Sequence, residues 1–263
     1  MKFWKMHGIG NDYIVVDNRG GEIKESELSN LSKNLCRRRF SVGSDGLLLV
    51  YPSTKADVRM RMFNPDGSEA EMCGNGIRCL AKYVFENGIV EKENFSIETL
   101  AGNKEVWLSL EDGEVAKVEV DMGEPEILDL NQDLEIEGQN FSVNKVSLGN
   151  PHAVIFVDEI TDELLEKYGP KIESHPSFPN RTNVEFVKVI NKNEVELRVW
   201  ERGAGETLAC GTGACAAVVA GKELDLLYEK IVLRLRGGDL EVEIRHGKVF
   251  LKGTVEKSFI GEI

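Results

Sequence analysis

Two segments far apart in the chain share one alternation of polar and hydrophobic positions. Residues 57–63 and residues 194–200 each alternate polar and apolar side chains and end in an aromatic ring. This two-residue period predicts a strand with one buried face. After a short polar loop, each segment reaches a cysteine beside glycines and then an apolar run, residues 77–86 and 214–222, that predicts a helix. Repetition over this length indicates a duplicated domain rather than a solenoid.

The remaining pattern consists mostly of strands. Strands are predicted at residues 2–6, 13–17, 47–51, 95–100, 105–110, 116–120, 141–148, 183–190 and after residue 231. A short helix is predicted to begin at Thr161 and to stop at Gly169-Pro170. The helix after Cys210 is apolar on nearly every side, as expected of a helix buried at a centre. We therefore expect an α/β fold of the α+β type, in which two pseudo-symmetric domains each wrap a barrel-like, mostly antiparallel sheet around a central helix.

A turn-rich tetrapeptide, Met122-Gly-Glu-Pro125, marks the expected domain boundary. An acidic segment, residues 127–139, connects this turn to the next predicted strand. Beyond it the pattern of the first half begins again, because residues 145–152 echo residues 5–13. No low-complexity segment or flexible linker separates the halves. We expect an N-terminal half over residues 1–122 and a C-terminal half over residues 123–256.

Composition and charge exclude several classes of partner. The 263 residues are 41% hydrophobic and carry a formal net charge of −13. A chain this acidic repels nucleic acid and anionic membrane surfaces, and the basic run at residues 37–39 is too short to reverse that. No stretch approaches the ~20 apolar residues of a membrane span, and the N-terminus lacks the apolar core of a signal peptide. We expect a cytoplasmic protein that binds neither nucleic acid nor membrane.

The five cysteines do not form the pattern of a disulfide framework or a metal site. Their number is odd, and the spacings within the pairs Cys73/Cys79 and Cys210/Cys215 differ from the C-x-x-C of zinc sites. Cys36, Cys79 and Cys215 lie in apolar helical contexts and are expected to be small buried hydrophobic residues. Cys73 and Cys210 differ from them because each stands among glycines where a helix begins. We expect no metal.

A cysteine at a helix start is suited to proton transfer. Unpaired backbone N–H groups and the helix dipole are expected to lower the pKa of such a thiol and to bind an anion, such as a carboxylate or a phosphate. One such cysteine is equally typical of a nucleophile, a redox centre, an anion cradle or a buried structural residue. Two matched ones, Cys73 and Cys210, favour a thiolate that removes a proton from a substrate carbon and a thiol that delivers one to its opposite face. That chemistry inverts a stereocentre.

Polar residues near the predicted strand ends are candidates for substrate binding. Four asparagines lie in or beside turns, where asparagine is also a common turn former: Asn11, Asn64, Asn150 and Asn183. Gly10-Asn11 and Gly149-Asn150 recur at matching points of the halves, which favours substrate contacts. Glu201 and Arg202 follow a strand and suit an ammonium and a carboxylate group, although an exposed ion pair is the alternative. His152 is either a structural histidine or a residue that polarises the site.

No cofactor is expected. The chain has no Walker A or GxGxxG motif and no lysine in a recognisable Schiff-base context, so neither a nucleotide nor pyridoxal phosphate is indicated.

Over essentially its whole length the sequence resembles the diaminopimelate epimerase family. The resemblance rests on Lys5-Met-His-Gly-Ile-Gly-Asn-Asp12, Phe63-Asn-Pro-Asp-Gly-Ser-Glu69, Cys73-Gly-Asn-Gly-Ile-Arg-Cys79, Gly149-Asn-Pro-His152, Arg181-Thr-Asn183, Trp200-Glu-Arg-Gly-Ala-Gly-Glu-Thr207 and Ala209-Cys-Gly-Thr-Gly-Ala214. It implies a pyridoxal-phosphate-independent isomerase that interconverts LL- and meso-diaminopimelate for lysine and peptidoglycan precursors. It also implies an active site between two domains, with residues 257–263 returning to the first.

Residue roles follow from the same resemblance. It implies that Cys73 is the acid and Cys210 the base for the LL substrate, with the roles exchanged in reverse. His152 and Glu201 are implied as supporting residues near the cysteines. The implied substrate-binding residues are Asn11, Asn64, Gly74, Asn75, Asn150, Asn183, Glu201, Arg202, Gly211 and Thr212, of which Gly74-Asn75 and Gly211-Thr212 bind the α-carboxylate through backbone amides.

One departure and three alternatives remain. Some family members have glutamine where this chain has Gly46, so a substrate contact from that side chain is lost. A racemase of another amino acid, similar to proline racemase, is the nearest alternative, although the run after Glu201 differs from the one typical of that family. A phenazine-biosynthesis-like isomerase shares the fold without the paired cysteines, and a thiol redox sensor is the third alternative. Exposed edge strands favour a homodimer.

Overall fold

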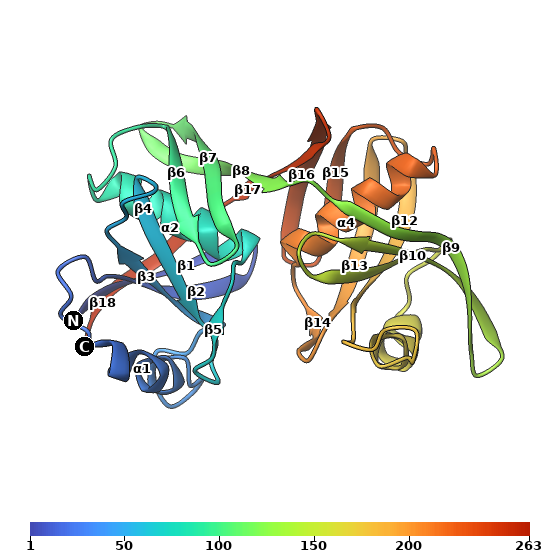
Figure 1. Cartoon of the computed structure of the whole chain (residues 1–263), viewed down its shortest axis with the longest axis horizontal. Coiled ribbons are helices and arrows are strands. Elements are labelled where there is room, and N and C mark those ends of the chain that lie inside the picture. The colour runs from blue at the N-terminus through green and yellow to red at the C-terminus, as the bar shows by residue number, and fades with distance from the viewer. The chain divides into compact units, whose positions relative to one another are not determined.

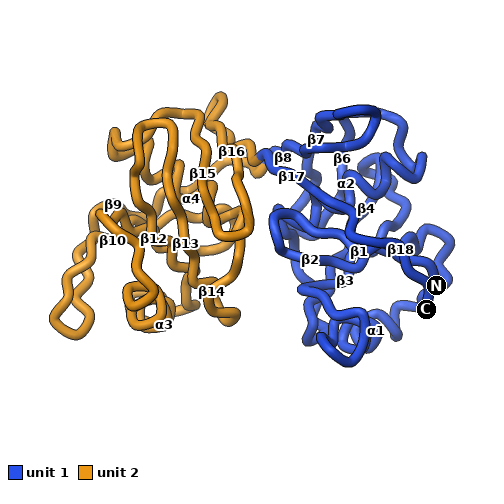
Figure 2. Tube along the Cα trace, turned by 180° about the vertical axis from the view of Figure 1, so that it is seen from behind, with its two compact units in different colours: residues 1–121, 252–263 blue, residues 122–251 orange.

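The structure is a computed structural model that describes all residues from Met1 to Ile263 (Figure 1). The chain forms two compact units, coloured separately in Figure 2. Unit 1 comprises Met1–Asp121 and Lys252–Ile263, and unit 2 comprises Met122–Leu251. The chain enters unit 2 beside the predicted turn. It returns to unit 1 at Lys252, within the strand Lys248–Thr254.

Unit 1 is a curved sheet with one long helix and one short helix. Its strands are β1 (Lys2–Gly8), β2 (Asn11–Asp17), β3 (Gly46–Tyr51), β4 (Val58–Phe63), β5 (Glu69–Ala70), β6 (Asn94–Thr99), β7 (Gly102–Glu111), β8 (Glu114–Gly123) and β18 (Glu256–Glu262). Its helices are α1 (Leu28–Leu35), which a 3₁₀ turn at Glu25–Glu27 precedes, and α2 (Gly74–Glu86). Neighbouring strands pair antiparallel except β2 with β3 and β4 with β6, which are parallel.

Unit 2 repeats this plan. Its strands are β9 (Glu126–Ile136), β10 (Gln139–Ser147), β11 (Pro151–Phe156), β12 (Asn183–Asn191), β13 (Glu194–Glu201), β14 (Gly205–Thr207), β15 (Lys230–Leu235), β16 (Gly238–Arg245) and β17 (Lys248–Thr254). Its helical segments are a π-helical turn at Leu164–Tyr168, α3 (Gly169–Glu173) and α4 (Gly211–Glu223). The parallel pairs are β11 with β12 and β13 with β15, which match those of unit 1.

A long helix lies against the strands of each unit, as the hydrophobic pattern predicts. Helix α2 contacts β1, β2, β3, β4 and β7, and helix α4 contacts β10, β11, β12 and β16. Eleven of the thirteen residues of α2 and ten of the thirteen residues of α4 are buried. The predicted fold of two pseudo-symmetric α/β domains, each with a mostly antiparallel sheet around a central helix, is confirmed.

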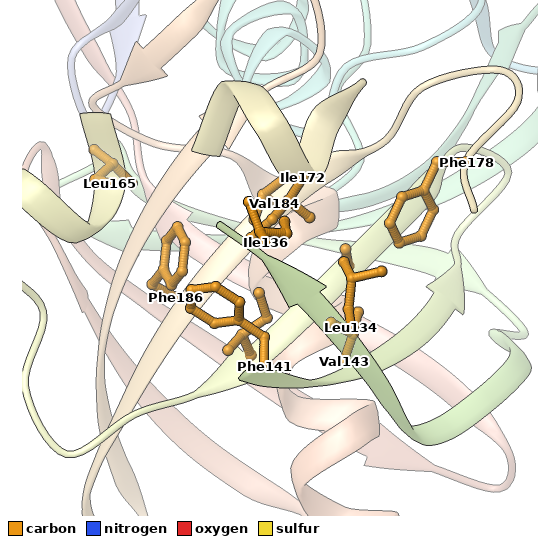
Figure 3. Close-up of a cluster of buried hydrophobic side chains, with 11 residues drawn as sticks. Leu134, Ile136, Phe141, Val143, Leu165, Ile172, Phe178, Val184 and Phe186 are labelled. Carbon is orange, nitrogen blue, oxygen red and sulfur yellow. The ribbon is translucent and has the colours of Figure 1, made fainter. Parts of the chain in front are cut away.

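Two local predictions in unit 2 are wrong. The acidic segment at residues 127–139 is largely strand β9, which pairs with β10 although only Leu134 and Ile136 of it are buried. Figure 3 shows these two side chains within the buried cluster that also contains Phe141 and Phe186. The apolar residues of β9, at positions 127, 128, 130, 134 and 136, do not keep a two-residue period, so the sequence pattern does not predict this strand.

Gly169-Pro170 does not stop the predicted short helix. The chain continues as α3, with proline in its first turn, where the missing N–H group costs nothing. The glycine is needed for packing, since a Cβ at Gly169 would lie 2.9 Å from Cγ of Trp200. The glycine that resembles a helix stop in the sequence therefore allows helix α3 to pack closely against the strand that carries Trp200.

Candidate active site

The two repeated cysteines occupy the same backbone position in their units. Cys73 directly precedes α2 and Cys210 directly precedes α4, and both have extended backbone angles, φ −140° and ψ 126° for Cys73 and φ −121° and ψ 111° for Cys210. Each helix begins with a glycine and two further small or polar residues. The first N–H groups of a helix have no partner within it, so both thiols stand beside amides able to bind an anion.

The approach to each cysteine is held by the same ion pair. The Arg61 guanidinium binds Glu69 through two bonds, Nε–Oε1 at 2.7 Å and Nη2–Oε2 at 2.8 Å. The counterpart in unit 2, 137 residues later, is Arg198 with Glu206, where Nε lies 2.8 Å from Oε1. Each pair links β4 to β5 or β13 to β14, and the strand registers also correspond. In both units, therefore, an equivalent ion pair holds the segment that leads to the cysteine.

Around Cys73 the structure gathers two asparagines and a tyrosine. The Tyr13 hydroxyl lies 3.0 Å from Sγ of Cys73 and donates to Oδ1 of Asn11 at 2.6 Å. The same Asn11 oxygen accepts a bond from Nδ2 of Asn75 at 3.1 Å. The predicted residues Asn11 and Asn75 thus lie in one hydrogen-bonded group with the thiol, together with Tyr13, which the sequence analysis did not select.

The orientation of Asn11 is fixed by carboxylates and cations behind it. Its amide donates to Oδ2 of Asp45 at 2.8 Å, and Arg38 donates to Oδ1 of Asp45 at 2.7 Å. Burial alone raises the pKa of Asp12, but hydrogen bonds from Lys5 and Arg38 outweigh it and hold that pKa below its usual value. Because Arg38 binds both carboxylates, the short basic run of the sequence has a structural role here.

Asn64 lies apart from this group. Its side chain donates to Oγ of Ser68 at 3.0 Å within its own loop, and its carbonyl oxygen accepts a bond from Ser32 at 2.7 Å. The turn-forming interpretation therefore describes Asn64 as it stands in this structure.

Around Cys210 the structure gathers a threonine, an asparagine and a histidine. Sγ of Cys210 lies 3.6 Å from Oγ1 of Thr212, which accepts a bond from Nδ2 of Asn150 at 3.2 Å. Oδ1 of Asn150 lies 3.1 Å from Nε2 of His152. Nδ1 of His152 lies 2.7 Å from Oε1 of Glu185, and a carboxylate only accepts, so Nδ1 donates this bond. Both side chains of this pair are fully buried.

The other predicted residues of unit 2 form a second group. Oδ1 of Asn183 accepts a bond from the backbone N–H of Arg202 at 3.0 Å, and its Nδ2 donates to the carbonyl of Pro151 at 2.9 Å. The Arg202 guanidinium bonds the carbonyl of Asn180 at 3.2 Å. Glu201 accepts a bond from the Thr207 hydroxyl. Glu201 also acts electrostatically on Cys210, which links this group to the thiol.

The expected lowering of the Cys210 pKa is wrong for this structure. Burial raises the pKa of this thiol well above its ordinary value, and the charges of Glu201 and Glu185 raise it further. Hydrogen bonds from Thr212 and from the Gly213 amide act in the opposite direction and are the smaller effect. With 6% of its surface exposed, Cys210 lacks the solvation that a helix-start thiolate needs, so it is a neutral thiol near neutral pH.

The three remaining cysteines are buried, as predicted. Cys36, Cys79 and Cys215 expose at most 3% of their surface, and none of the five cysteines forms a disulfide. Burial raises the pKa of Cys79 to about 12. These thiols are packing residues rather than reactive groups.

Sequence reasoning missed Tyr13 and Glu185, although a signal for Tyr13 was present. The echo between the halves places Tyr13 opposite His152, two residues after the matched asparagines Asn11 and Asn150. Nothing in the sequence pattern distinguishes Glu185, because its neighbours in β12 are apolar and it follows no turn. Only its fully buried contact with His152 identifies it.

Known proteins resemble this chain over nearly its whole length. A family model described as diaminopimelate epimerase matches residues 3–128 and 145–258. A diaminopimelate epimerase of Acetivibrio thermocellus is 50% identical over 277 residues, covering all of this chain and 98% of the relative. One from Pelotomaculum thermopropionicum is 48% identical over 275 residues with the same coverage. The chain belongs to the diaminopimelate epimerase family.

Solved structures of other proteins share the fold of this diaminopimelate epimerase family member. A hydroxyproline epimerase from Agrobacterium vitis aligns with a TM-score of 0.78 and 17% identity, covering all of this chain and 90% of the other. A phenazine biosynthesis protein from Bacillus anthracis aligns with a TM-score of 0.75 and 17% identity, covering all of this chain and 98% of the other. At this identity the likeness concerns the fold alone, which different activities use.

The structure has neither a candidate membrane-spanning helix nor a candidate metal site. No helix is both long and apolar enough to cross a membrane. No group of three or more histidine, cysteine, aspartate or glutamate side chains is arranged to hold a metal ion.

Proposed function

We propose that this chain is an isomerase that interconverts LL- and meso-diaminopimelate without pyridoxal phosphate, by proton transfer between two cysteines. The observation that carries the proposal is the matched placement of Cys73 and Cys210 directly before the central helices α2 and α4, in a member of the diaminopimelate epimerase family. Helix-start amides beside each thiol suit the substrate α-carboxylate and the charge that develops when the α-proton leaves.

The reaction needs one thiolate and one thiol. With the LL substrate, the Cys210 thiolate takes the α-proton, so that a C–H bond breaks and an S–H bond forms. The Cys73 thiol then gives its proton to the opposite face of the same carbon. The reverse reaction exchanges these roles, and neither direction involves a net oxidation.

The raised pKa of Cys210 is compatible with its role as a base once substrate is present. The negative charge of Glu201 is one cause of the raised pKa. A substrate ammonium group paired with Glu201 offsets this charge and thereby lowers the pKa of the thiol. Hydrogen bonds from Thr212 and from the Gly213 amide already favour the thiolate.

The polar residues near the cysteines are proposed to hold the substrate. His152 and Glu201 support the cysteines, and amides of Gly74-Asn75 and Gly211-Thr212 bind the α-carboxylate. The substrate, particularly its distal amino-acid end, is held by the polar side chains of Asn11, Asn64, Asn150, Asn183, Glu201 and Arg202. A substrate with two charged ends matches this many amide and charged groups better than a small apolar amino acid does.

Exchange of the α-hydrogen with solvent tests the proposal. The protein is incubated in deuterated water with LL-diaminopimelate and, separately, with proline, glutamate and histidine. We expect deuterium at one α-carbon of diaminopimelate and appearance of the meso isomer, because a cysteine that has exchanged its proton returns deuterium to the carbon. Exchange of proline instead would establish a proline racemase-like activity. Epimerisation with full retention of the substrate hydrogen would exclude the two-cysteine mechanism.

We also propose that the protein is a cytoplasmic homodimer. Five cysteines without a disulfide suit a reducing compartment. Apolar side chains on β18 and at the adjoining end of the chain, Phe259, Ile260 and Ile263, are about half exposed and suit contact with a second copy. Sedimentation equilibrium is expected to give the mass of two chains.

A further inference from the structure

We infer that Tyr13 is the positioning residue of the Cys73 thiol and takes in unit 1 the place that His152 takes in unit 2. The inference rests on the proposed proton transfer by the two cysteines. Tyr13 supports Cys73 both when that cysteine is a thiol and when it is a thiolate.

The strand registers make Tyr13 and His152 equivalent. In unit 1, β2 runs parallel to β3 with Tyr13 opposite Gly46. In unit 2, β11 runs parallel to β12 with His152 opposite Asn183. Gly46 and Asn183 are themselves 137 residues apart, the spacing that relates Cys73 to Cys210. Tyr13 and His152 therefore occupy equivalent positions in the strands of the two units.

The hydrogen bonds of the two side chains repeat as well. The Tyr13 hydroxyl lies 2.6 Å from Oδ1 of Asn11, and Nε2 of His152 lies 3.1 Å from Oδ1 of Asn150. Each asparagine is in turn linked to the second residue of the helix start, Asn75 in unit 1 and Thr212 in unit 2. Tyr13 makes one further contact, because its hydroxyl also reaches Sγ of Cys73 at 3.0 Å.

Packing leaves the Tyr13 ring one position. The residue is 1% exposed. A Cβ at Gly46 would lie 3.2 Å and 3.3 Å from the ring carbons Cε1 and Cδ1, so the glycine is in close contact with the ring. From the helix side, Gly76 lies close to both Cζ of Tyr13 and the Leu48 side chain. The hydroxyl is thereby held between Asn11 and Cys73 without freedom to leave them.

A hydroxyl in this position serves both forms of the thiol. When Cys73 is a thiol, Tyr13 donates its hydrogen to Oδ1 of Asn11 and accepts one from S–H. When Cys73 is a thiolate, the same hydroxyl turns and donates to sulfur, which stabilises the negative charge. Burial, with the nearby Cys73 as a second cause, raises the pKa of Tyr13 well above its ordinary value, so the hydroxyl keeps its hydrogen at neutral pH. One rotating O–H group therefore suits a cysteine that acts as acid in one direction and base in the other.

The test replaces the hydroxyl and measures Cys73 directly. Tyr13→Phe is compared with Tyr51→Phe, which removes a partly buried hydroxyl of the same unit that accepts a bond from Asn18 at 2.7 Å. The rate of iodoacetamide alkylation at Cys73 is followed against pH by mass spectrometry. We expect Tyr13→Phe to raise the apparent pKa of Cys73 by about one unit and to lower kcat/KM about tenfold in both directions, because the thiolate loses a donor. Tyr51→Phe is expected to change neither.

The alkylation profile decides the inference. An unchanged Cys73 profile in a folded Tyr13→Phe protein overturns it, even where activity falls. Should that variant not fold, 3-fluorotyrosine at position 13 keeps the ring and makes its hydroxyl a stronger donor, which should lower the apparent pKa of Cys73; an unshifted profile there also overturns the inference. Alkylation needs no substrate, so failure of the deuterium-exchange test with diaminopimelate leaves this measurement valid, and the converse also holds.

Discussion

The surroundings of Cys73 and Cys210 differ although their backbones match. Both thiols precede a thirteen-residue helix and follow strands that an Arg–Glu pair joins. At matched positions, however, unit 1 has a tyrosine over an apolar leucine, Leu48, whereas unit 2 has a histidine bonded to the carboxylate of Glu185. The repeated fold thus fixes where each thiol and its amides stand. The neighbouring side chains, which differ between the units, determine the electrostatic surroundings of each thiol.

A second difference lies within the helices. Arg78 of α2 is fully buried and bonds the carbonyl of Gly74 at 3.1 Å and Oδ1 of Asn75 at 2.9 Å, which fixes the first turn. Its counterpart in α4, 137 residues later, is Cys215, which cannot make these bonds. Unit 1 therefore places a cation under the helix start of its thiol, and unit 2 places an anion beside its thiol. The anions beside Cys210 favour its thiol form, so the proposed removal of a proton from the LL substrate depends on a substrate cation that offsets them.

The largest effect is expected from removing either thiol. Cys73→Ala and Cys210→Ala should each lower epimerisation of LL-diaminopimelate by about 10³-fold or more, because each deletes one of two obligatory proton-transfer groups. Circular dichroism should show both variants folded. Cys215→Ala removes a buried thiol from the helix that Cys210 precedes and should retain most activity. A single active-site variant with near-normal turnover would contradict the two-cysteine mechanism.

Replacing the glycine at the third position of each helix by alanine should lower the free energy of unfolding by different amounts in the two units. In Gly213→Ala the new atom would lie 2.5 Å from Oε1 of Glu185, so the buried pair with His152 must move; we expect a loss of about 3 kcal/mol. In Gly76→Ala the nearest atom is Cδ2 of Leu48 at 3.3 Å, and we expect a change within about 1 kcal/mol. Urea unfolding of both variants measures this, and equal losses would show that the surroundings are not different as described.

Neutralising Glu185 should change the reactivity of Cys210 alone, and it should lower activity less than removing a cysteine does. Glu185→Gln removes a negative charge that raises the pKa of Cys210, so alkylation of that thiol should move to lower pH. Its pKa stays above the ordinary value, because burial, the larger cause, remains. We expect kcat/KM to fall about tenfold as His152 loses its carboxylate. Glu194→Gln, at an ion pair with Arg234 that lies nearer the surface, is the control; an alkylation profile of Glu185→Gln that matches it would contradict the electrostatic coupling.

Much of the fold, and the backbone position of both cysteines, could be predicted from the sequence alone. The 137-residue repeat places Cys73 and Cys210 at equivalent helix starts, and the apolar character of residues 214–222 identifies a buried helix. These features follow from local periodicity and spacing, which are written directly in the sequence. The error at β9 arises where pairing with the next strand decides the local structure, and the error at Gly169 arises where packing against Trp200 decides it.

The sequence by itself determined the duplication, the two thiols, the family and the asparagines that repeat beside them. Tertiary structure alone decided that Tyr13 touches Cys73, that Glu185 is buried against His152, and that burial raises the pKa of Cys210. The physical reason is that periodicity is a property of neighbouring residues, whereas desolvation and hydrogen bonding depend on which residues, distant in the chain, the fold brings together. Two similar motifs can therefore have the same backbone geometry and different electrostatic surroundings.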